Sequence, residues 1–170
     1  MGLRVSLEIY LRMDGIAGSA KTYAYRDWSP IRSWHWGLAR TRRSQNGSSS
    51  EVININQITL IKPIGIESPM LMNLFAQRTI VQSADISVAH PAAKREAQQK
   101  LIDVNLNKIL IQSIDTDVST DESELLETVV IRFNQVKYDY FHTERAQQGG
   151  TGATTTCESF CWEAQNANSR

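Results

Sequence analysis

The chain has 170 residues, and its 18 basic and 18 acidic side chains give a formal net charge of zero. This length favours one domain able to bury a core, and the balanced charge gives no long-range field to attract nucleic acid or an anionic membrane. No segment reaches the roughly 18 apolar residues of a membrane helix, and Arg4, Glu8 and Arg12 make the start too charged for a signal peptide. We therefore expect a chain that folds in the cytoplasm, without stable membrane insertion.

Alternating apolar and polar residues predict β-strands in the first half of the chain. These strands are expected at 5–12, 22–26, 31–38 and 52–61. Asp14-Gly15 and Gly18-Ser19 mark turns between them. Trp34 and Trp36 lie two positions apart on one predicted strand, a spacing that usually fills a core or an interface.

Residues 40–50 form a basic, serine-rich stretch that is too polar to pack and long for a hairpin tip. We predict a flexible, protruding loop here. Because such a protrusion has no use in its own core, we expect it to contact a neighbouring subunit. The candidate contact residues are Arg40, Arg42, Arg43, Ser44, Gln45 and Asn46.

One helix is predicted over 69–78. Ser68-Pro69 fits an N-cap serine followed by a proline at the first helical position. Leu71, Leu74 and Phe75 then form an apolar stripe at helical spacing. We expect Leu74 and Phe75 to be buried against the β-structure.

The second half of the chain returns to strand patterning. A strand is predicted at 79–89, followed by a long β-hairpin over 100–141 with its turn at 115–121. A flexible loop near 146–156 leads to a final strand or extended tail at 158–165. The fold class is therefore mainly β, with about 7–9 strands and one packed helix. A closed barrel or two packed sheets would remove the exposed strand edges.

The polar residues form no coherent catalytic set. His35, His90 and His142 are not at metal-ligand spacing, and none is near a nucleophile in the sequence. Cys157 and Cys161 would lie roughly 13 Å apart on one strand, too far for a disulfide. We expect no catalytic residue, no metal site and no cofactor.

Two other function classes stay open from the residues alone. An enzyme whose site is assembled in space would need a deep pocket joining His35 or His142 to a carboxylate. A nucleic-acid binder would use Trp34 and Trp36 beside the arginines of 40–50, although we expect no nucleic-acid partner.

The order of landmarks along the chain resembles the haemolysin-coregulated protein (Hcp) family, which forms the tube of type VI secretion systems. The landmarks lie at 14–19, 34–37, 59–62, 68–71, 127–140 and 160–163, with Asn166 after them. They span about residues 5–166. Together with the strand and helix patterns they give, as candidate structural residues, Trp34, Trp36, Ser68, Pro69, Leu74, Phe75, Phe133 and Trp162.

The resemblance implies a single β-barrel domain over 1–170 that assembles as a hexameric ring. It further implies that rings stack into a tube inside a contractile sheath, and that effectors ride in its channel or on its tip. The implied partners are other copies of this chain, sheath and spike proteins, and effectors. Export through this machine, in virulence or bacterial competition, would need no signal peptide. The alternative is an adaptor or chaperone built on the same ring, which shields one small effector.

Overall fold

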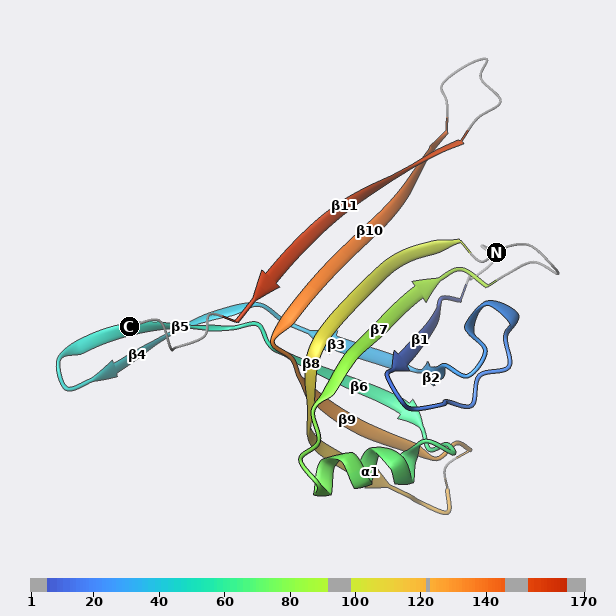
Figure 1. Cartoon of the computed structure of the whole chain (residues 1–170), viewed down its shortest axis with the longest axis horizontal. Coiled ribbons are helices and arrows are strands. Elements are labelled where there is room, and N and C mark those ends of the chain that lie inside the picture. The colour runs from blue at the N-terminus through green and yellow to red at the C-terminus, as the bar shows by residue number, and fades with distance from the viewer. Residues whose placement is uncertain (1–5, 92–98, 122, 146–152, 165–170) are drawn as a thin grey trace.

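Strands make up most of the protein, and one α-helix packs against them (Figure 1). A computed structural model describes residues 6–91, 99–121, 123–145 and 153–164. The strands in this part of the chain are β1 Glu8–Met13, β2 Ser29–Ile31, β3 Ser33–Trp36, β4 Ala39–Gln45, β5 Ser48–Asn54, β6 Gln57–Pro63, β7 Val81–Ala89, β8 Lys100–Asp117, β9 Leu126–Arg132, β10 Gln135–Arg145 and β11 Ala153–Glu163. The helix α1 is Ser68–Ala76, and a short 3-10 turn, η1, is Tyr23–Tyr25. The mainly-β prediction with one helix is confirmed, while the eleven described strands exceed the expected seven to nine.

Strand pairing runs in the order β2-β1-β7-β8-β9-β6-β3. β2 and β3 are separated only by Arg32, so they form one continuous stretch that pairs first with β1 and then with β6. The Arg32 amide bridges the two parts by donating to the Ile61 carbonyl at 2.8 Å. The pairing order therefore returns to its start through residues 29–36, and this curvature encloses the core.

The long strand β8 belongs to two parts of this sheet. Its first half pairs with β7 and β10, and its second half pairs with β9. Lys108 sits at the change with φ 52°, a left-handed conformation that is uncommon for a residue with a Cβ. Just beyond this change, the pairing of β8 with β9 shifts register between Ile111 and Ser113, which marks a bulge there.

The predicted hairpin over 100–141 is therefore wrong in its second arm. That arm is two strands, β9 and β10, divided at Phe133 and Asn134. Phe133 is buried, and its amide donates to Asn56, whereas the Asn134 amide donates to Asn107. The chain thus changes partner at this point, which a continuous alternation in sequence does not reveal.

Three further predictions about elements need correction. The predicted strand at 22–26 is instead the 3-10 turn η1 with one flanking residue on each side. The predicted strand 52–61 is interrupted at Ile55 and Asn56, between β5 and β6. Residues 40–50 are not an irregular loop, because β4 and β5 pair with each other throughout.

One face of the sheet β1-β7-β8-β10-β11 lies on the main core, and the alternate residues form a largely polar face on which a smaller apolar cluster packs at β1 and β7. One row across it on the core side contains Leu11, Ile86, Val104, Tyr138 and Phe160, paired in register. The core cluster includes these first three residues and continues onto β6 and β9.

An aromatic group extends this core between β3 and the β10–β11 pair. The Trp36 ring lies 6.3 Å from Phe133 and 6.0 Å from Tyr138, and Phe133 lies 6.4 Å from Trp162. Trp36 also donates from Nε1 to the Ile55 carbonyl at 2.7 Å. Trp34 packs half-buried on the same core. Four of the candidate structural residues thus meet in one region.

The helix differs from its prediction at both ends. Glu67, rather than Ser68, occupies the N-cap position, with no side-chain capping bond, and Pro69 lies in the first turn. Leu71 is buried and Leu74 packs against the core, but Phe75 is 46% exposed. Phe75 lies about 100° around the helix from Leu74, so at this end of the helix it points away from the core.

A buried ionic cluster anchors the start of the helix. Lys62 Nζ lies 2.8 Å from Glu127 Oε1 and 3.0 Å from Glu67 Oε1, and all three side chains are at most 1% exposed. The Ser68 hydroxyl donates to Glu127 at 2.7 Å and accepts from the Gly65 amide at 2.9 Å. Removing Lys62 would leave two buried carboxylates without their shared cation, so this cluster holds α1 against β6 and β9.

Candidate subunit-contact surfaces

The β4–β5 hairpin projects away from the rest of the molecule (Figure 1). Its strands pair only with each other in the described residues, and every side chain described in 39–54 is exposed. Its tip is Asn46-Gly47, with φ 51° and 78°, the geometry of a two-residue hairpin turn with both φ values positive. The protrusion predicted from the sequence is therefore present, but as an ordered pair of strands.

The hairpin is basic and carries apolar side chains near its base. Arg40 lies 3.6 Å from Glu51, whereas Arg42 and Arg43 make no ion pair with a described residue. Ile53 is 52% exposed and Leu38, just before β4, is 58% exposed. A pair of strands covered on neither face is at best marginally stable by itself, so this hairpin is suited to be covered by another chain.

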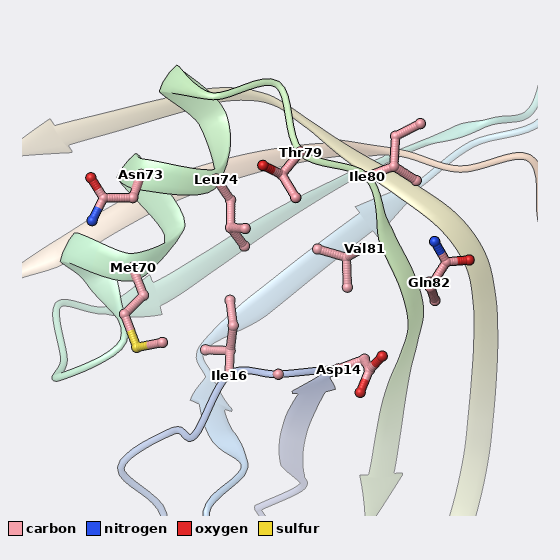
Figure 2. A pocket seen from close by; sticks show the side chains of 10 residues that line it. Asp14, Ile16, Met70, Asn73, Leu74, Thr79, Ile80, Val81 and Gln82 are labelled. Atoms are coloured by element: carbon pink, nitrogen blue, oxygen red, sulfur yellow. The ribbon is translucent and has the colours of Figure 1, made fainter.

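A shallow cavity of about 320 Å³ lies between α1, the start of β7 and the turn after β1. In Figure 2, Met70 and Leu74 on the helix face Ile16 on the turn, and Val81 points into the same space. Ile80, at its rim, is 56% exposed. We call this the α1–β7 groove; the lining residues are Asp14, Gly15, Ile16, Met70, Asn73, Leu74, Thr79, Ile80, Val81 and Gln82.

The sequence prediction missed this groove. Met70 comes just before the apolar stripe of the helix, and Ile80 comes after the helix ends. Only the packing of α1 beside β7 brings the two side chains to one groove. The available signal was weak: both are apolar residues placed outside the stripe that the helix buries.

The polar face of the sheet carries cross-strand ion pairs. Arg12 lies 2.5 Å from Asp85, which also accepts from Asn105 at 2.6 Å. In the same row, Asn105 is opposite Lys137, and Lys137 is opposite Cys161. This row crosses five strands, so it forms a polar stripe on this side of the sheet.

A second set of polar contacts on that face is centred on Asp139. Lys137 Nζ lies 2.9 Å from Asp139 Oδ2, and the Ser159 hydroxyl donates to Asp139 Oδ1 at 2.5 Å. Burial alone would raise the pKa of Asp139, but these two partners outweigh it and hold that pKa below its ordinary value. The hydrogen bond that Lys137 donates to Asp139, together with the negative charge of Asp139, raises the pKa of Lys137. Both groups are therefore charged at neutral pH.

The histidines lie apart from one another in chemically different places. His35 is exposed in a shallow cavity whose other lining residues are Trp34, Trp36, Leu38, Tyr138 and Phe160. His142 Nε2 lies 2.6 Å from the Thr156 hydroxyl, and its ring stacks on Tyr140. Neither set of neighbours includes a carboxylate. A catalytic site built on one of these histidines would need one beside the ring.

The two cysteines are free and exposed on β11. This strand pairs with β10 only, so its outer edge is unpaired within the described residues. Among those residues, no three His, Cys, Asp or Glu side chains are close enough to hold a metal ion. No helical segment that the structure describes has the length and apolar character needed to cross a bilayer.

Comparison with known families identifies the chain. Residues 10–140 match the family described as "Type VI secretion system effector, Hcp". The chain belongs to the Hcp family. It is thus a protein of the type VI secretion system, as the ordered landmarks of the sequence indicated. No curated protein matched the chain.

Solved structures share the fold across nearly the whole chain. A structure described as a type six secretion system protein has a TM-score of 0.72 at 12% identity, covering 93% of this chain and 96% of the other. Hcp1 from Salmonella typhimurium has a TM-score of 0.63 at 19% identity, covering 89% of this chain and 92% of the other. A type VI secretion system effector from Yersinia pestis has a TM-score of 0.62 at 15% identity, covering 89% of this chain and 99% of the other.

Proposed function

We infer that this chain is a tube subunit of a bacterial type VI secretion system. Six copies form a ring, rings stack into the inner tube, and sheath contraction propels the tube with effectors in its lumen or on its tip. The subunit needs no active site, because the sheath supplies the work. The partners are further copies of this chain, sheath and spike proteins, and effectors, and the subunit leaves the cytoplasm through the machine itself.

The uncovered β4–β5 hairpin carries this proposal within the Hcp family. All its described side chains are exposed, and it extends beyond the sheet that holds the core. A chain that acted as a monomer would gain nothing from ordering such a hairpin, whereas a subunit gains a contact arm. The candidate contact residues Arg40, Arg42, Arg43, Ser44, Gln45 and Asn46 all lie on it.

Native mass and electron microscopy test the proposal. The purified chain is expected to have a mass near six copies and to show rings that stack into tubes as its concentration rises. Replacing Arg42 to Gln45 by a short Gly-Ser linker should leave the fold intact and weaken these assemblies. A wild-type chain that stays monomeric at high concentration would refute the tube assignment.

Deletion of the gene separates a tube subunit from the adaptor alternative. Loss of secretion of every type VI substrate is expected for a tube subunit. Loss of a single effector, with other secretion intact, would assign the chain as a specialised adaptor or chaperone on the same ring.

A further inference from the structure

We propose that the α1–β7 groove of one copy receives the β4–β5 hairpin of another. This inference rests on the proposed function, because it names the acceptor surface for the contact arm. The groove and the hairpin lie in different parts of the molecule: α1 lies at the lower end of the sheet, while the hairpin extends to the left (Figure 1).

The groove offers apolar surface that its own chain leaves open. Its cavity volume of about 320 Å³ is at the low end of the roughly 300–1,000 Å³ of small-molecule pockets. It is lined by Ile16, Met70 and Ile80, and Met70 and Ile80 are 44% and 56% exposed. These dimensions and this chemistry suit a few aliphatic side chains of a partner better than an enclosed metabolite.

The hairpin presents matching side chains. Val52 and Ile53 are exposed on β5, on opposite faces of the hairpin, and Leu38 is exposed where the chain enters β4. Covering such apolar surface is favourable in proportion to its area. These residues lie toward the base of the hairpin, and the hairpin itself projects beyond its own sheet (Figure 1).

Charge favours the same pairing. Asp14 is the sole charged residue lining the groove, and it is exposed with no ion pair to a described residue. Arg42 and Arg43 on the hairpin have no acidic partner in their own chain as described. Opposite charges on two different surfaces fix orientation between copies.

A hairpin-to-groove contact is heterologous, since the two contacting surfaces differ. Each copy then keeps one free hairpin or one free groove for the next copy, so the contact repeats around a ring or along a stack. A self-complementary contact would instead stop at two copies. The proposed geometry therefore fits the repeated assembly of this family.

Site-specific photocrosslinking tests the contact. Ile53→p-benzoylphenylalanine places the probe on the hairpin, and its exposed position leaves the fold unchanged, which a melting curve verifies. Irradiation of assembled protein is expected to give crosslinked chains whose links map, by mass spectrometry, to residues 14–16 or 70–82. Links that map elsewhere on an assembled protein would overturn this inference and leave the tube assignment standing.

A groove substitution provides the second arm. Ile80→Glu, combined with the probe, should lower the crosslink yield about tenfold or more, because the contact would bury an unpaired carboxylate. Leu7→Glu is the matched control, since Leu7 is a similarly exposed aliphatic residue outside the groove, and it should leave the yield unchanged. Equal yields from both variants would also overturn the inference. A wild-type chain that never assembles would refute both proposals together.

Discussion

At the residue scale, a close backbone contact explains why the predicted turn at Gly18-Ser19 contains a glycine. The Gly18 amide donates to the Asp27 carbonyl at 2.6 Å, so two chain segments lie directly against each other. A Cβ at position 18 would overlap the backbone of Trp28 and Ser29. This turn therefore requires glycine for space, with an ordinary backbone conformation.

Gly18→Ala is expected to lower the free energy of unfolding by roughly 1–3 kcal/mol, because backbone atoms must move to admit the methyl group. Urea unfolding measures the change. Gly37→Ala is the control, since the nearest atom to its new Cβ would be His35 Nε2 at 3.7 Å, an ordinary contact. An equal loss of unfolding free energy in the two variants would contradict the close contact between Gly18 and the backbone of Trp28 and Ser29.

Asp139 gives a pH-dependent prediction. Its pKa is held below the ordinary value in the folded chain, so the ionised form favours folding above the unfolded pKa of about 3.9. That contribution is lost as the pH falls through the folded pKa. Asp139→Asn should therefore lower the melting temperature at pH 7, and the difference from wild type should shrink below about pH 4.

Asp117→Asn is the control for this measurement. Asp117 is exposed and makes no ion pair with a described residue, so its variant should melt close to wild type at pH 7. A constant difference for Asp139→Asn across the whole pH range would contradict a role for the carboxylate charge.

At the element scale, the helix shows how far an apolar pattern predicts burial. Leu71 is 2% exposed, whereas Phe75, four residues later in the same stripe, is 46% exposed. The stripe identifies the helix correctly, since any amphipathic spacing does so. Which end of the stripe is buried depends on the shape of the sheet beneath it.

Truncation of Leu71 and of Phe75 should therefore lower the free energy of unfolding by different amounts. Leu71→Ala should destabilise the isolated chain by roughly 2–5 kcal/mol, as buried leucines do. Phe75→Ala should change its stability by less than about 0.5 kcal/mol, as is usual for surface positions. Thermal unfolding of the two variants side by side measures both. A large loss for Phe75→Ala would show that this ring is covered in the chain by itself.

The hairpin illustrates a different limit of sequence patterns. Residues 40–50 are polar on both faces of the pair, so they lack the alternation that marks a half-buried strand. The turn Asn46-Gly47 was the usable signal, because this pair favours a two-residue hairpin turn. The serine-rich composition suggested an irregular loop instead.

At the scale of the whole molecule, the histidines test the structural reading of function. Replacing His35, His90 and His142 one at a time with Gln should leave secretion within a few-fold of wild type. The reason is that the cavity around His35 is lined by aromatic and aliphatic side chains and that His142 bonds a threonine. A variant that assembled normally yet abolished secretion would show that one of these side chains has a chemical role.

The sequence by itself determined the fold class, the helix and the family. Alternation is a local property of a strand, the Ser68-Pro69 helix start is also local, and the ordered landmarks needed no coordinates. These three conclusions therefore followed from neighbouring residues or from their order along the chain.

Only the tertiary structure decided which surfaces are open. Three features join residues that are distant in sequence: the change of partner strands along β8 near Lys108, the return of the pairing order through 29–36, and the groove beside α1. Lys62 reads as a polar break in a strand until Glu67 and Glu127 are seen to surround it. Exposure depends on what the rest of the chain covers, and no local pattern contains that information.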